Sequence, residues 1–210
     1  MPSSRDKNNT MPNPRDLLIG EHQLIGDIIG DSFSNDPVNL WIFGGQEGMR
    51  QYYVKAAQKL YLSQGYGHVM ENENGGSLWL PPGTDKHIPI IKSLDIAASM
   101  IKHGGFKSLL RGMTVDNALA KARPKTPHYY LFAIGARQGH QGKGVGGQLM
   151  RKGLERADAE NMPAYLESSK ESNVSFYRLY GFEVMRTILP KDGCPPLWLM
   201  WRDAKHNTAV

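Results

Sequence analysis

Cysteine, long hydrophobic runs and basic clusters are all scarce in this sequence. Cys194 is the single cysteine in 210 residues, which excludes an internal disulfide framework and a zinc site built from several cysteines. No apolar run approaches the roughly 20 residues needed to span a bilayer, and residues 1–15 lack the apolar core of a secretory signal. The sequence therefore indicates a reducing, cytoplasmic compartment and no membrane partner.

The charge balance is mildly basic. Lys and Arg number 25 against 20 Asp and Glu, which gives a formal net charge of +5. No stretch interleaves basic with aromatic residues, so we expect no nucleic-acid partner. A balance of this size suits a small anionic ligand, and we expect no metal cofactor. The oligomeric state cannot be read from these features.

Hydrophobic periodicity divides the chain into a polar tail over residues 1–15 and a single domain over residues 16–210. Strands are expected over 16–19, 66–71, 77–80, 128–136, 164–167, 182–189 and 196–200. Helices are expected from 21 to about 35, and over 47–63, 88–104, 106–121, 145–161 and 173–180. A hairpin turn is expected at Asn74-Gly75-Gly76. Alternating strands and helices indicate an α/β or α+β fold.

A glycine-rich segment, Gln141-Gly142-Lys143-Gly144-Val145-Gly146-Gly147, lies between an expected strand and an expected helix. Glycines let backbone N–H groups converge on phosphate oxygens, and the helix that follows adds the positive end of its dipole. A Walker loop is excluded because Gly144 stands where that loop needs Ser or Thr. A turn without any ligand is the structural alternative.

Two nucleotide-binding patterns compete for this segment. Gly142-x-Gly144-x-x-Gly147 fits a dinucleotide fingerprint, with Glu167 placed 20 positions after Gly147. Against it, the strand ends near Ala136, several residues too early, and only 43 residues follow Glu167. Gln141-x-x-Gly144-x-Gly146 fits the pyrophosphate arm of a coenzyme A site, and its context favours this second pattern.

That context is a resemblance to a known family. Residues 124–202 resemble the C-terminal half of the GNAT superfamily of N-acetyltransferases, and within it puromycin N-acetyltransferase and its relatives. The resemblance is carried, in matching order and spacing, by 123–127 (RPKTP), 140–146 (HQGKGVG), 163–169 (PAYLESS) and 173–182 (NVSFYRLYGF). It implies a mixed, mostly antiparallel sheet flanked by helices, with a splayed central strand pair, and acetyl-CoA as co-substrate.

The resemblance also implies the site residues. The strand before the loop would splay at a bulge and bind the pantetheine arm, while Tyr177, four residues after Asn173, would protonate the leaving thiolate. Tyr180 aligns instead with a packing position. The expected cofactor-binding residues are Ile134, Gly135, Ala136, Gln141, Gly142, Lys143, Gly144, Val145, Gly146, Gly147, Asn173 and Tyr177.

Glu167 is the first candidate for the general base, because it ends a strand beside the expected splay; a salt bridge on an edge strand is an equal alternative. His128 is a second candidate. Cys194 matches no nucleophile pattern of the family, so direct transfer without an acyl-enzyme is expected. The aromatic residues Phe33, Trp41, Phe43 and Trp79 could line an acceptor cleft.

The function expected is transfer of an acetyl group from acetyl-CoA directly to a primary amine of a small molecule or peptide. A non-catalytic acyl-CoA-binding regulatory module and a protein or histone acetyltransferase are the alternatives. The catalytic residues expected are Tyr177 and Glu167.

Overall fold

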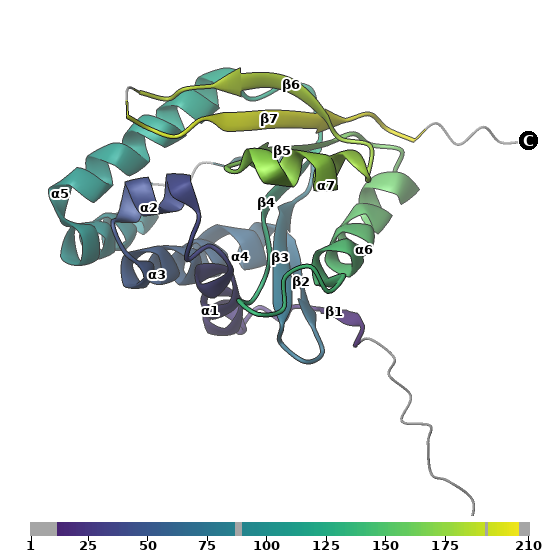
Figure 1. Cartoon of the computed structure of the whole chain (residues 1–210), viewed down its shortest axis with the longest axis horizontal. Helices are drawn as coiled ribbons and strands as arrows, with labels where there is room; N and C mark the ends of the chain where they lie inside the picture. Colours follow the sequence, from purple (N-terminus) through teal and green to yellow (C-terminus); the bar gives the residue numbers. More distant parts are fainter. Residues whose placement is uncertain (1–11, 87–89, 192, 206–210) are drawn as a thin grey trace, which may run out of the picture.

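The computed structural model describes residues 12–86, 90–191 and 193–205 (Figure 1). Its centre is a seven-stranded sheet in the order β1-β2-β3-β4-β5-β7-β6. The pair β4–β5 is parallel and the other neighbouring pairs are antiparallel. The strands are β1 (Pro14–Asp16), β2 (Tyr66–Met70), β3 (Gly75–Leu80), β4 (Tyr129–Ala136), β5 (Ala164–Ser168), β6 (Glu183–Ile188) and β7 (Leu197–Arg202).

Helices cover both faces of the sheet (Figure 1). On one side lie α1 (His22–Ser32), α2 (Pro37–Phe43), α3 (Gln46–Ala56), a π-helical turn (Ala57–Tyr61), α4 (Leu62–Gln64) and α5 (Ile90–Ala122). On the other lie α6 (Val145–Ala159), a 3-10 turn (Glu171–Asn173) and α7 (Val174–Arg178). The expected mixed, mostly antiparallel α/β architecture is confirmed.

Each strand divides its side chains between two hydrophobic cores, as the pleat of a strand requires. Tyr130 packs into the core beneath α1–α5, while its neighbours Tyr129 and Leu131 pack into the core beneath α6 and α7. On β3, Leu78 packs into the core beneath α1–α5 and Trp79 packs into the core beneath α6 and α7. This alternation decides which side chains of β4 and β5 can reach the functional site.

The first strand begins earlier than expected. Strand β1 covers Pro14–Asp16 rather than 16–19, and Pro14 pairs with Met70 of β2. Pro14 and Arg15 therefore belong to the sheet and not to a tail. Residues 1–11 of the expected tail lie outside the described residues.

The hairpin turn also differs from the expectation. Gly75 and Gly76 belong to β3, and the turn is formed by residues 71–74. A Cβ at Gly75 would lie 2.4 Å from Val145 Cγ1, and one at Gly76 would lie 2.3 Å from Ile25 Cδ1. These glycines therefore let α6 and α1 approach β3 closely from opposite faces, and they do not form the turn.

Two breaks between helices follow from particular residues. Asp36 is the last residue of the segment between α1 and α2. It caps α2, because its carboxylate accepts a hydrogen bond from the Asn39 backbone N–H at 2.8 Å. Helix α2 was not expected from the sequence. The expected division of the long helical segment at Gly104-Gly105 is confirmed: Gly105 has φ 72° and ψ 177°, which interrupts α5.

Candidate active site

The central parallel strands separate after a short paired stretch. Strand β4 pairs with β5 only from Tyr129 to Leu131, opposite residues 164–166, whereas its pairing with β3 continues to Ala136. The register shift falls between Leu78 and Trp79, which leaves Phe132 as the extra residue on β4. The expected fork between β4 and β5 is present, with its apex at Leu131.

The expectation of a bulge over Ile134–Ala136 is wrong, because the bulge of β4 lies at Phe132. Gly135 has a different reason to be glycine: a Cβ there would lie 2.0 Å from Ser32 Oγ at the end of α1. Close packing between β4 and α1, not a bulge, therefore requires glycine at this position.

A cavity of about 990 Å³ lies at this fork, between the strands and the helices α1, α2, α3 and α5. Its lining combines aromatic rings with aliphatic and charged side chains, and the Tyr61 and Phe132 rings stack with centroids 3.9 Å apart. Trp79, expected as a possible wall residue, is fully buried in the opposite core, and Trp41 is also outside the lining. The aromatic lining residues are Phe33, Phe43, Tyr52, Tyr53, Tyr61, Tyr130, Phe132 and Tyr177.

Asn173 and Tyr177 reach this cavity from the other side of the sheet. Both residues line it, although Tyr177 belongs to the core under α6 and α7. The Tyr177 side chain is buried, and burial raises the pKa of its phenol above the usual value, with the charge of Asp36 acting in the same direction. The phenol is therefore protonated at neutral pH, as a proton donor must be.

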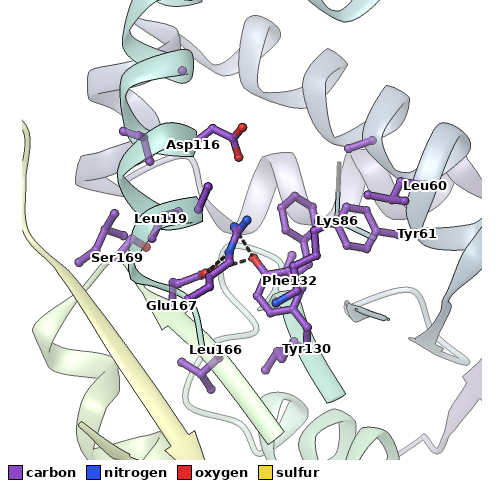
Figure 2. A pocket seen from close by; sticks show the side chains of 18 of the residues that line it. Leu60, Tyr61, Lys86, Asp116, Leu119, Tyr130, Phe132, Leu166, Glu167 and Ser169 are labelled. Carbon is purple, nitrogen blue, oxygen red and sulfur yellow. Dashed lines mark hydrogen bonds and ion pairs between the residues drawn. The ribbon is translucent and has the colours of Figure 1, made fainter. Parts of the chain in front are cut away.

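Glu167 is the first residue of β5 beyond the paired stretch, and it faces the cavity (Figure 2). Its Oε1 accepts from Arg123 Nε at 2.7 Å, and its Oε2 accepts from the Tyr130 hydroxyl at 2.5 Å. The salt bridge considered for Glu167 is therefore present. It is not on an edge strand, because β5 lies between β4 and β7.

Lys86 lies in the same wall, beside Tyr130 and Phe132 (Figure 2). Its Nζ is 3.0 Å from His128 Nε2 and 3.8 Å from the centroid of the Tyr130 ring. Burial lowers the pKa of Lys86 to about 7, which outweighs the opposing effect of Glu167. Sequence reasoning missed this residue, because the 42 positions between Lys86 and His128 hide their contact.

The glycine-rich loop follows β4 and leads into α6, outside the cavity lining. Gly142 has φ 73° and Gly144 has φ 81°, both in the left-handed region that favours glycine. Residues 141–144 are exposed, and Val145 is buried at the start of α6. The Gln141 side chain donates to the Ala136 and Ser32 carbonyls at 3.4 and 3.5 Å, which ties the loop to β4 and α1.

Two later glycines of this segment serve packing. A Cβ at Gly147 would lie 2.7 Å from the Tyr180 hydroxyl, and one at Gly146 would lie 3.4 Å from the Phe176 ring. Both contacts join the first turn of α6 to the region of α7. The structure thus places Lys143 and the first glycines at an exposed helix start, while Gly146 and Gly147 face a neighbouring element.

Residues 109–182, from the second half of α5 through α7, match the family model described as "Acetyltransferase (GNAT) family". The chain carries a GNAT-family acetyltransferase domain. The match includes the fork, the glycine-rich loop and Tyr177, and it identifies the protein as an acyltransferase enzyme.

Relatives of this acetyltransferase match over most of its length. An uncharacterized N-acetyltransferase, C550.08, from Schizosaccharomyces pombe is 27% identical over 197 residues, 85% of this chain and 78% of the relative. The structure is similar to a histone acetyltransferase HPA2 and related acetyltransferase from Corynebacterium glutamicum, with TM-score 0.71, 24% identity and coverage of 95% and 99%. It is also similar to arylalkylamine N-acetyltransferase 2 from Aedes aegypti, with TM-score 0.56, 15% identity and coverage of 91% and 99%.

Cys194 of the acetyltransferase is buried, and its sulfur donates to the Pro195 carbonyl oxygen at 3.3 Å. Burial raises the pKa of this thiol, which keeps it in the unreactive protonated form. In the described part of the chain, no helix is long and apolar enough to cross a membrane. No group of three or more His, Cys, Asp or Glu side chains suited to a metal ion occurs among those residues.

Proposed function

We propose that this acetyltransferase moves an acetyl group from acetyl-CoA directly to a primary amine of a small molecule or peptide. The observation that carries the proposal is the opening of the β4–β5 fork onto a large cavity with Tyr177 in its wall. Direct attack of an amine on a thioester needs such a shared space, because donor and acceptor must meet without a covalent enzyme intermediate.

The donor side is supported by the loop and the fork. The backbone N–H groups between Gln141 and Gly147 lie in the loop before α6 and in its first turn. The positive end of the helix dipole there favours binding of a diphosphate. The edge of β4 beyond Leu131, at Ile134–Ala136, is free of β5 and can hydrogen-bond an extended pantetheine arm. Bound acetyl-CoA would supply the thioester. Lys143 is exposed at the same helix start and suits the negative charge.

Two residues are proposed for the proton transfers. Tyr177 donates its hydroxyl proton to the departing thiolate, and Asn173, one turn before it, lines the same wall. Glu167 lies at the fork on the acceptor side, where its carboxylate attracts the acceptor ammonium and takes its proton. Arg123 and Tyr130 hold that carboxylate in place.

The cavity favours an acceptor with a large apolar or flat body. Its volume of about 990 Å³ leaves room for a bulky acceptor, and the Phe and Tyr rings in its lining offer flat apolar surface. Two similar structures are named for different acceptors, one as a histone acetyltransferase and the other as an arylalkylamine N-acetyltransferase. The aromatic residues in the cavity lining favour a small-molecule amine with an aromatic or apolar body over a histone tail.

A panel of amines with acetyl-CoA tests the proposal, with free CoA thiol measured by a thiol-reactive dye. We expect thiol release that depends on the amine and is strongest for bulky apolar amines. Binding of acetyl-CoA without release over a broad panel would favour the non-catalytic module. Release with peptides alone would favour a protein acetyltransferase.

A further inference from the structure

The acceptor cavity already contains an amine that belongs to the chain. Lys86 follows the turn after β3, and its Nζ lies in the cavity wall beside Tyr130 and Phe132 (Figure 2). We propose that Lys86 is an internal acceptor, which the enzyme acetylates on Nζ when no external amine occupies the cavity. The inference rests on the proposed function, because acetyl-CoA must be the donor.

The three groups closest to Nζ include no carboxylate, and the more distant charge of Glu167 is outweighed by burial. Nζ lies 3.0 Å from His128 Nε2, and 3.8 and 5.2 Å from the centroids of the Tyr130 and Tyr165 rings. None of these three groups carries a negative charge at neutral pH. Because burial also favours the uncharged amine, Lys86 resembles the free-base acceptor that thioester attack requires.

His128 is oriented to receive a proton from this amine. Its Nδ1 is 2.6 Å from the Thr126 carbonyl oxygen, which can only accept, so Nδ1 carries the hydrogen. Nε2 then has a free lone pair directed at Lys86 Nζ. Burial lowers the pKa of His128, so the ring is neutral before the reaction.

The ring of Tyr130 lies between Lys86 and the fork. Nζ lies over the Tyr130 ring, and the hydroxyl of that ring donates to Glu167 at the point where β4 and β5 separate. A lysine side chain has four rotatable bonds, so Nζ can swing across the ring towards the thioester. Bulky acceptors would occupy the same volume and would therefore protect Lys86.

The step balances in atoms and protons. The Nζ lone pair forms a C–N bond to the acetyl carbonyl carbon, and the C–S bond breaks with its electron pair going to sulfur. Nζ loses one proton, which reaches His128 Nε2 through water after Nζ has moved to the thioester, and the sulfur gains one proton from Tyr177. Return of the His128 proton to the Tyr177 phenolate through water completes the cycle. The products are acetyl-lysine and free CoA.

Isotope-labelled acetyl-CoA tests this inference. The full chain is incubated at pH 7.5 without an amine, digested, and the label at each lysine is quantified by mass spectrometry. Lys125 is the matched control, because it also lines the cavity but is exposed. We expect Lys86 to be labelled at least about tenfold faster than Lys125, since burial favours the uncharged, nucleophilic form of Lys86.

Variants separate enzymatic from chemical labelling. Tyr177→Phe should slow labelling of Lys86 by the same factor as acetylation of an external amine, whereas labelling of Lys125 should not change. Lys86→Arg should lose the fast label and Lys125→Arg should keep it. A good external acceptor should slow labelling of Lys86.

The pH dependence gives an independent readout. The titratable and charged groups facing Lys86 are His128, Tyr130, Tyr165, Glu167 and Arg123. Labelling of Lys86 should rise through pH 7 and level off near pH 8, because burial lowers its pKa to about 7.

Lys86 labelled no faster than Lys125 would overturn the inference. Thiol release with the amine panel, measured on the same preparation, then shows whether the proposed function stands without it.

Discussion

Arg123 Nε and Glu167 Oε1 form a 2.7 Å ion pair beside the point where β4 and β5 separate. The two side chains are 18% and 7% exposed, so each carries its charge out of bulk water. A pair of this kind fixes the carboxylate at the fork, on the side that we propose for the acceptor. It also makes the stability of the domain depend on keeping both partners.

Removing Arg123 alone should be strongly destabilising. Arg123→Leu would leave Glu167 buried with its hydrogen bond from Tyr130 but without its ion-pair partner, at an expected cost of about 3–5 kcal/mol in the free energy of unfolding. The double variant Arg123→Leu/Glu167→Leu removes both charges and should recover much of that loss. Urea denaturation measures both values. A double variant as unstable as the sum of the single variants would contradict the ion-pair explanation.

Tyr177→Phe should reduce kcat by about 10²- to 10⁴-fold, the usual contribution of a positioned acid. The affinity for acetyl-CoA should change little, because the ring and its packing against Phe176 and Phe182 remain. Steady-state kinetics with calorimetric titration of the donor separates the two effects. Tyr180→Phe is the matched control and should retain turnover. Equal turnover of the Tyr177 variant and the parent would remove Tyr177 from the mechanism.

Gly144→Asp should abolish the rise in melting temperature that acetyl-CoA produces. The new Cβ and carboxylate would lie at the start of α6, where they oppose a bound diphosphate. Gly139→Asp is a control for backbone strain. Gly139 has φ 76° and Gly144 has φ 81°, so an aspartate is in a left-handed conformation at either position. Thermal melts with and without acetyl-CoA should show the shift in the control only. NAD should give no shift, and a shift with NAD alone would contradict the coenzyme A site.

His68 should make the fold sensitive to mild acid. The side chain is 2% exposed, and burial lowers its pKa to about 4, from about 6.5 in the unfolded chain. The folded state therefore binds this proton less readily, so the stability contributed by neutral His68 is present above pH 6.5 and declines as the pH falls to 4. A shift of this size amounts to about 3 kcal/mol.

Urea denaturation at several pH values checks this prediction. His68→Gln should flatten the dependence between pH 6.5 and 4, whereas substitution of the exposed His103 by Gln should leave it unchanged. An unaltered slope in the His68 variant would assign the acid sensitivity to other groups.

Local sequence signals predicted most of the helices and strands, and the proposed donor side of the site depends on the same kind of signal. The helix periodicity after Gly144, the aromatic strand up to Ala136 and the spacing of Asn173 and Tyr177 all depend on neighbours within a few positions. Glycine was the least reliable signal, because Gly75, Gly76 and Gly135 satisfy close packing between elements and not a turn or a bulge. Helix α2 was missed because one residue, Asp36, both follows α1 and caps the next helix.

The sequence by itself determined the glycine-rich loop, the order of strands and helices, and the pairing of Asn173 with Tyr177 on one short segment. These depend on backbone conformation and on spacing along the chain. Only the tertiary structure decided the proposed acceptor side, where Glu167 contacts Arg123 from 44 positions away and Lys86 contacts His128 from 42. Charge pairing and burial act through space, and no local pattern records which distant side chains the fold brings together.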